Sequence, residues 1–145
     1  MSPGGVDRDI LRRHLLALDS ALKNLRRHAG RPLEALTDDT DEAWAVERGL
    51  LLCIQNALDI ASHLAAGTGH DVPNYTSAID LMATLGIMPA EFVARFRGAA
   101  GFRNVVVHAY LDVDLTIVHS LINERLSEFE EFARYIQQYL DGSDS

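Results

Sequence analysis

The sequence predicts an all-α protein, an up-and-down bundle of four main helices and one short helix. Three observations lead to this fold class. Apolar residues recur at steps of three and four through most of the chain. Only four prolines and ten glycines interrupt its 145 residues, and no segment alternates apolar and polar residues. Nearly half of the residues are apolar, which suits one core in a single domain over residues 1–145, with 1–6 and 142–145 as flexible ends.

The first two predicted helices carry the longest apolar patterns. The first helix has one face formed by Leu11, Leu15, Leu18, Leu22 and Leu25, and Gly30 and Pro32 end it. The second follows the acidic run of residues 38–42, which suits a helix N-terminus, and closes at Gly67. Its two adjacent apolar stripes are Trp44, Leu51, Ile54, Leu58 and Ala61, and Leu50, Cys53, Ala57, Ile60 and Leu64. Two stripes predict a helix buried on a wide face at the centre of the bundle.

Three further helices complete the predicted bundle. A short one spans Tyr75–Leu85, with a cap near Asn74 or Thr76. The next begins at Pro89, because proline favours the first helical position. A long last helix follows a cap at Asp112 or Asp114. Its apolar positions keep helical spacing: Val118, Leu121, Ile122, Phe129, Phe132, Ile136 and Leu140.

The composition also limits where the protein acts. No apolar run reaches the roughly 18–20 residues that cross a bilayer, and the first residues lack the pattern of a signal peptide. We therefore expect a cytoplasmic protein without a membrane partner. Cys53 has no cysteine or histidine at metal-ligand spacing, so we expect a buried thiol and no metal site. His63 follows Asp59 by four residues, which predicts a hydrogen bond across one helical turn.

The charge is acidic overall but uneven. A net charge of −8 argues against a protein that coats nucleic acid, because phosphate contacts need basic side chains, and we expect no DNA binding. Residues 92–111, however, carry Arg95, Arg97 and Arg103 and no acidic residue. This basic island predicts local phosphate binding, and the alternative is that the three arginines are simply solvated.

Arg103, His108 and Tyr110 are the chemically capable side chains of one short apolar stretch. Cleaving RNA without a metal needs a base, an acid and a cation, and histidine and arginine supply them. On an ideal helix Arg103 and His108 lie about 140° apart, so either the helix ends or bends between them or they meet equivalents from a second chain. From spacing alone, a structural histidine and a surface arginine remain the commoner explanation.

The stretch from Gly101 to Asp114, GFRNVVVHAYLDVD, resembles the motif of HepT-type toxins in the HEPN helical superfamily. That motif is Arg, four residues, His, one residue and Tyr, followed by Val-Asp before the last helix. The stretch from Glu47 to Leu64, with its Asp-Ile-Ala-Ser-His run, resembles the second helix of the same family. The likeness covers nearly the whole chain.

The resemblance implies a HEPN-like homodimer that acts as a metal-independent endoribonuclease, the toxin of a type VII-like toxin–antitoxin system. Arg103 and His108 of both protomers would be the catalytic residues of a shared cleft, supported by Asn104. RNA would be the substrate, and transfer RNA is one target known within the family. The implied partner is a MntA-type nucleotidyltransferase antitoxin, which uses ATP and Mg to adenylylate Tyr110, while this chain itself needs no cofactor.

Two other functions stay open on the sequence. In the first, the chain is a non-catalytic HEPN binding module that docks a nucleotidyltransferase or a nucleotide, with Arg103 and His108 holding phosphate. The acidic balance favours this alternative, because tight RNA binding is not expected of it. In the second, the chain is a structural helical oligomer without a site.

Overall fold

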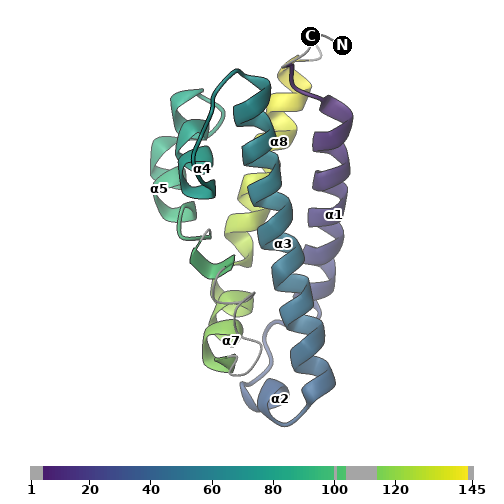
Figure 1. Ribbon diagram of the computed structural model, residues 1–145. Coiled ribbons are helices and arrows are strands. Elements are labelled where there is room, and N and C mark those ends of the chain that lie inside the picture. Colours follow the sequence, from purple (N-terminus) through teal and green to yellow (C-terminus); the bar gives the residue numbers. More distant parts are fainter. Residues whose placement is uncertain (1–4, 100, 104–113, 144–145) are drawn as a thin grey trace.

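The computed structural model describes residues 5–99, 101–103 and 114–143, and every regular element in these ranges is a helix. The helices are α1 Arg8–Arg26, α2 Glu34–Thr37, α3 Thr40–Gly67, α4 Tyr75–Thr84, α5 Ala90–Phe96, α7 Leu115–Glu124 and α8 Leu126–Ser143. Figure 1 shows α1, α3 and α8 running along the molecule, with α4 and α5 beside one half of α3 and α2 and α7 at the other end. The predicted all-α bundle is confirmed.

α3 is the central helix, because α1, α4, α7 and α8 all pack against it. One predicted stripe is completely buried: Leu50, Cys53, Ala57, Ile60 and Leu64. The other stripe is only partly correct, since Leu51 is half-buried and Trp44 is 67% exposed. Trp44 lies in the second turn of α3, where the four-residue α2 covers only one side of the helix.

The apolar character of α3 bears on the expectation that no apolar run is long enough to cross a bilayer, because polar residues such as Gln55, Asn56 and Asp59 interrupt it. Among the described helices, α3 is the one that is long and apolar enough to cross a membrane, by length and composition alone. Its most apolar window has a mean hydropathy of 1.3. More than half of that window, 56%, is buried inside the bundle. Packing against the neighbouring helices therefore explains why the segment is apolar.

The C-terminal half differs from the predicted single long helix. The helix breaks at Arg125, whose φ of −117° departs from helical geometry, so α7 and α8 are separate. The Arg125 guanidinium pairs with Glu128 and lies 5.4 Å from the ring centroid of Phe102. All seven predicted apolar positions are nevertheless buried on both sides of the break. The apolar spacing continues across Arg125, so it could not reveal the break, and the four-residue α2 was likewise not predicted.

Side-chain caps set several helix starts. Asn74 caps α4 by accepting a hydrogen bond from the Ser77 amide at 2.8 Å, and Asp114 caps α7 by accepting one from Thr116 at 3.0 Å. Both are among the predicted caps. Pro89 stands one residue before α5 and not in its first position, with an extended ψ of 143°.

The N-terminal segment docks on the end of α3. A Cβ on Gly67 would lie 2.7 Å from Val6 Cγ2 and 2.8 Å from Val6 Cα, so glycine permits this close approach. The Asp7 amide donates to His63 Nε2 at 3.0 Å. The predicted bond between His63 and Asp59 is wrong: the Asp59 carboxylate accepts from Gln55, and His63 bonds the Asp7 amide. Within the ends expected to be flexible, Val6 packs on the core and residues 142–143 belong to α8.

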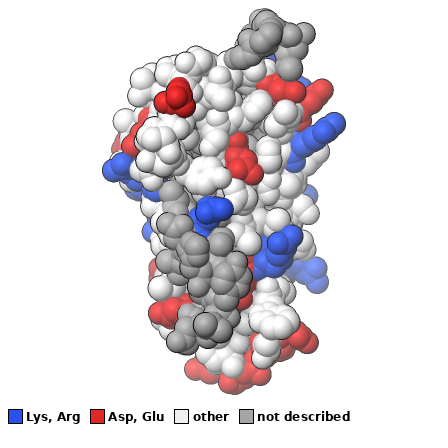
Figure 2. Space-filling model, viewed as in Figure 1, with Lys and Arg blue, Asp and Glu red and all other residues white. Residues whose placement is uncertain are grey.

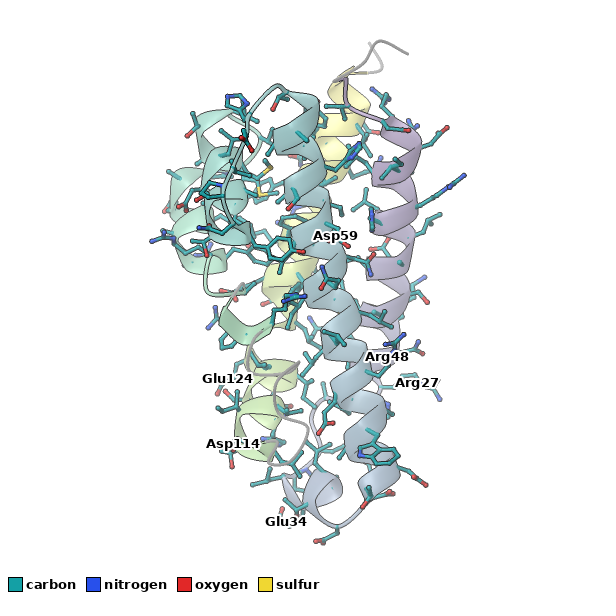
Figure 3. The ribbon with its side chains drawn as sticks, in the orientation of Figure 1. Arg27, Glu34, Arg48, Asp59, Asp114 and Glu124 are labelled. Carbon is teal, nitrogen blue, oxygen red and sulfur yellow. The ribbon has the colours of Figure 1, made fainter. Side chains whose placement is uncertain are left out.

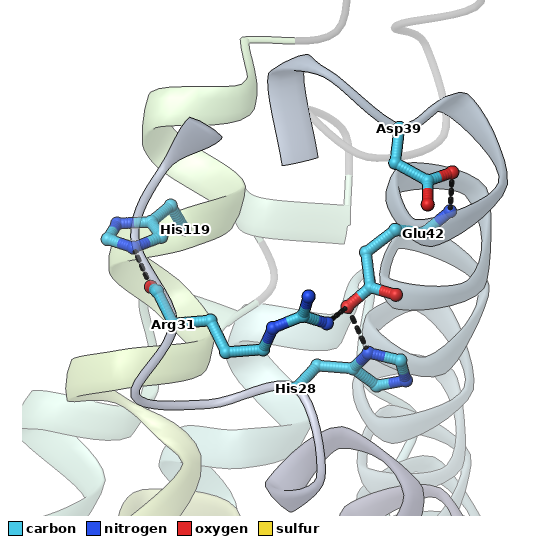
Figure 4. Close-up of polar contacts among 5 residues, drawn as sticks. All are labelled: His28, Arg31, Asp39, Glu42 and His119. Carbon is cyan, nitrogen blue, oxygen red and sulfur yellow. Dashed lines mark hydrogen bonds and ion pairs between the residues drawn. The ribbon is translucent and has the colours of Figure 1, made fainter. Parts of the chain in front are cut away.

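A polar clamp of His28, Arg31, Glu42 and His119 ties the end of α1 to α3 and α7 (Figure 4). His28 Nδ1 lies 2.6 Å from a Glu42 carboxylate oxygen, which also pairs with the Arg31 guanidinium. His119 Nε2 donates to the Arg31 carbonyl at 2.8 Å. The hydrogen bond from His28, aided by the two positive charges, holds the pKa of Glu42 below its ordinary value.

This clamp makes stability depend on pH through Glu42. A carboxyl group whose pKa is lowered by folding stabilises the protein above its ordinary pKa and loses that contribution as the pH falls through the folded value. Glu42→Gln is therefore expected to lower the free energy of unfolding at pH 7 and to differ less from the parent at pH 4. Urea denaturation at both pH values measures this. Glu34→Gln removes an exposed carboxylate and is the control, and an equal deficit at both pH values would contradict the role of Glu42.

Candidate active site

Arg103 is the candidate site residue whose surroundings the structure describes. Asn104, His108 and Tyr110 lie outside the described residues. Arg103 is half-buried beside α3 and the start of α4. The groups that hold its guanidinium form the described part of the site.

Two neutral side chains hold Arg103. Its Nε donates to Gln55 Oε1 at 2.8 Å, and its Cζ lies 5.5 Å from the centroid of the Tyr75 ring. A guanidinium on an aromatic face at this distance gains a cation–π attraction. Because Nε is committed to Gln55, the Nη hydrogens at the outer edge of the guanidinium are the donors left for a phosphate.

Gln55 is itself held in one orientation. Its amide nitrogen donates to Asp59 Oδ1 at 2.8 Å and to the Tyr75 hydroxyl at 3.3 Å, so its carbonyl must face Arg103. Turning the amide over would place two donors together at Arg103 and two acceptors together at Asp59. Figure 3 shows Asp59 on α3, the helix that also carries Gln55 one turn earlier. Asp59 thus fixes Gln55, and Gln55 fixes Arg103.

Helix geometry explains why these residues meet. Gln55 and Asp59 are four residues apart on α3 and so lie on one face of it. Tyr75 is the first residue of α4, placed there by the Asn74 cap. Sequence reasoning missed Gln55 and Tyr75 as site residues. The available signal was the four-residue spacing of Gln55 and Asp59, two polar residues within a mostly apolar helix.

The other arginines of the basic island are neutralised by carboxylates. Arg97 pairs with Asp80 at 3.0 Å, and Arg95 lies 3.8 Å from Glu131. Within the described chain Arg103 has no such partner at ion-pair distance. The island as a whole is thus less basic than its sequence suggests, and Arg103 is its available cation. Figure 2 shows acidic side chains gathered at the end formed by α2 and the start of α3, far from α4. A phosphate would be repelled at that acidic end.

The remaining reactive side chains have structural environments. Cys53 is completely buried, and burial raises the pKa of its thiol to about 12, so it is not a nucleophile. His14 bonds Asn56 at 2.8 Å across α1 and α3. His70 is exposed, in the connection between α3 and α4. In the part of the chain that the structure describes, no three histidine, cysteine or carboxylate side chains gather where they could hold a metal.

A family model described as ribonuclease HepT-like matches residues 18–136. The chain belongs to the HepT-like ribonuclease family. Two relatives carry the family name. The tRNA nuclease HepT of Aphanizomenon flos-aquae is 26% identical over 133 residues, 90% of either chain. The mRNA nuclease HepT of Shewanella oneidensis is 23% identical over 130 residues, which cover 89% of this chain and 97% of that protein.

Solved structures share the fold of this HepT-like chain. The tri-AMPylated HEPN toxin of Shewanella oneidensis in complex with its MNT antitoxin superposes with a TM-score of 0.78 and 22% identity, covering 91% of this chain and 99% of that one. The cytosolic protein of unknown function YutE from Bacillus subtilis gives a TM-score of 0.80 at 19% identity, covering 95% and 93%. The predicted HEPN-like fold is confirmed.

Proposed function

We propose that this HepT-like chain is the toxin of a toxin–antitoxin pair, a metal-independent endoribonuclease that works as a homodimer in the cytoplasm. Arg103 and His108 are its catalytic residues, and Asn104 helps to position them. The observation that carries the proposal is the Arg103 guanidinium, which is held by Gln55 and Tyr75 and not neutralised by a described carboxylate. The nuclease names of its relatives support RNA as the substrate, with transfer RNA as the first candidate.

The proposed chemistry uses the RNA's own hydroxyl. His108 takes the proton of the 2′-hydroxyl, whose oxygen attacks the neighbouring phosphorus while the bond to the 5′-oxygen breaks. His108 of the second protomer donates a proton to the departing oxygen. The Nη groups of Arg103 bind the non-bridging oxygens, where charge grows in the transition state. The products are a 2′,3′-cyclic phosphate and a 5′-hydroxyl, and no metal takes part.

The proposed off-switch is Tyr110. A MntA-type nucleotidyltransferase with ATP and Mg²⁺ joins the Tyr110 oxygen to the α-phosphorus of ATP, and pyrophosphate leaves. Tyr110 follows His108 by two residues, so each AMP adds a negative charge and bulk where the RNA phosphate must bind. A solved relative of the same fold, the tri-AMPylated HEPN toxin, is described in complex with an MNT antitoxin, which supports this partner.

One cleavage assay tests the proposal. Purified parent protein is expected to cut transfer RNA in the presence of EDTA and to leave fragments with 2′,3′-cyclic phosphate ends. His108→Ala is expected to lose at least about a hundredfold in rate, because general acid–base catalysis contributes about 10²–10⁴-fold. His119→Ala, which removes a histidine bonded to the Arg31 carbonyl, is the matched control and should cut normally.

The same assay includes the off-switch. After incubation with the nucleotidyltransferase, ATP and Mg²⁺, the parent should gain the mass of one or more AMP units and stop cutting. Tyr110→Phe should keep its mass and its activity. Cleavage that needs a metal, or that survives in His108→Ala, would contradict the catalytic proposal, whereas AMP addition to Tyr110→Phe would contradict only the assigned target.

A further inference from the structure

A pocket lies next to Arg103 that the proposed chemistry does not use. It is about 530 Å³ in volume, within the usual range for small-molecule sites. Its walls are Ser62 and Ala66 of α3, residues 70–74 of the following connection, and Tyr75 of α4. Tyr75 also carries the Arg103 guanidinium, so the pocket and the candidate phosphate-binding group share one aromatic ring. A ligand group in the pocket would thus contact the same side chain that supports the candidate phosphate-binding group.

Asp71 and His70 contribute hydrogen-bond acceptors to the wall of this pocket. Asp71 contributes an exposed carboxylate. The Thr68 hydroxyl donates to the Leu64 carbonyl at 2.7 Å, so its oxygen accepts from His70 Nδ1, 3.1 Å away. That bond places the proton of a neutral His70 on Nδ1 and leaves Nε2 as an acceptor. A second phosphate is a poor fit for such a wall, because Asp71 would repel it.

We propose that this pocket holds a base of the RNA strand and prefers bases that carry an exocyclic amino group over uracil. The inference rests on the proposed ribonuclease function and names a specificity element for it. Cytosine presents its 4-amino group to an acceptor such as the Asp71 carboxylate, at the position where uracil has a carbonyl oxygen. Adenine and guanine also carry an amino donor, on C6 and C2 respectively. Tyr75 supplies an aromatic surface of the kind on which unstacked bases pack.

Oligo(C) and oligo(U) are the sharpest probes, since both are pyrimidines that differ at the exocyclic position. Eight-residue 2′-O-methyl forms lack the attacking hydroxyl and stay intact with the parent protein. Fluorescence anisotropy should show oligo(C) binding about tenfold more tightly than oligo(U). Asp71→Asn should bring the two dissociation constants to within about twofold, mainly by weakening oligo(C), because an amide no longer offers two acceptor oxygens.

Asp41→Asn is the matched control. It removes the same charge from the first turn of α3, roughly 37 Å along the helix from Ala66, and should keep the preference for oligo(C). Ala66→Trp fills the pocket and should weaken both oligomers, whereas Ala94→Trp on the exposed side of α5 should weaken neither.

Each other outcome overturns the inference. Equal binding of oligo(C) and oligo(U) by the parent, or an unchanged preference for oligo(C) in Asp71→Asn, would contradict the proposed base site. If those proteins still cut transfer RNA, the ribonuclease function stands without it. Failure to bind either oligomer together with failure to cut transfer RNA removes both the base site and the proposed function.

Discussion

Arg103→Ala is expected to lower the rate of RNA cleavage by about 10²–10³-fold, the usual cost of removing one group that stabilises transition-state charge. Gln55 fixes the Nε edge and Tyr75 supports the plane, so the guanidinium is positioned before RNA arrives. Little reorganisation is then needed as charge develops on the phosphate. Single-turnover cleavage of transfer RNA with saturating enzyme measures the chemical step directly.

Three further variants show whether the effect belongs to a positioned guanidinium. Arg97→Ala removes an equally basic residue that Asp80 already pairs, and should cleave normally. Arg103→Lys keeps the charge but not the two-pronged geometry, and should recover only a small part of the rate. Gln55→Leu should lower the rate about tenfold with a smaller effect on RNA binding. Full activity in Arg103→Ala, or equal losses in Arg97→Ala, would remove Arg103 from the mechanism.

Phe96→Ala is expected to lower the free energy of unfolding by about 3–5 kcal/mol, as large-to-small changes at buried aromatic sites do. The Phe96 ring is 1% exposed and stacks on Phe132 with centroids 4.8 Å apart. It also stacks on Phe92 at 5.3 Å and meets the edge of Phe129 at 5.3 Å. One side chain thus joins α5 to α8, and its loss leaves a cavity between them.

Urea denaturation followed by circular dichroism measures this loss. Leu16→Ala is the control, because Leu16 is 69% exposed and its truncation should change the free energy by less than about 0.5 kcal/mol. A loss below about 1 kcal/mol in Phe96→Ala would mean that α5 is not anchored through this ring. α5 ends seven residues before Arg103 in the chain. We therefore expect Phe96→Ala to lose cleavage activity at temperatures where half of its molecules are still folded.

The burial of residues along a single helix was predicted well, because the positions that face the core recur at a fixed helical spacing. The leucine face of α1 and the stripe from Leu50 to Leu64 are buried as their spacing predicts. The Asn74 and Asp114 caps follow from the same local chemistry. The break at Arg125 was not predicted, because buried positions keep their helical spacing on both sides of it. Trp44 was wrongly predicted to face the core, because its exposure depends on which neighbouring helix covers it.

The sequence by itself determined most of the helices, the family and the identity of Arg103 as a candidate, since all three depend on patterns along the chain. Only the tertiary structure decided what Arg103 touches. Gln55 and Tyr75 are 48 and 28 positions away from it, and no local pattern links them to it. The packing of α4 on α3 brings both to one guanidinium. The packing of α5 beside α4 and α8 places Asp80 at Arg97 and Glu131 at Arg95. Contacts between helices depend on how whole faces pack together, and for that reason the available cation could be identified only in the folded chain.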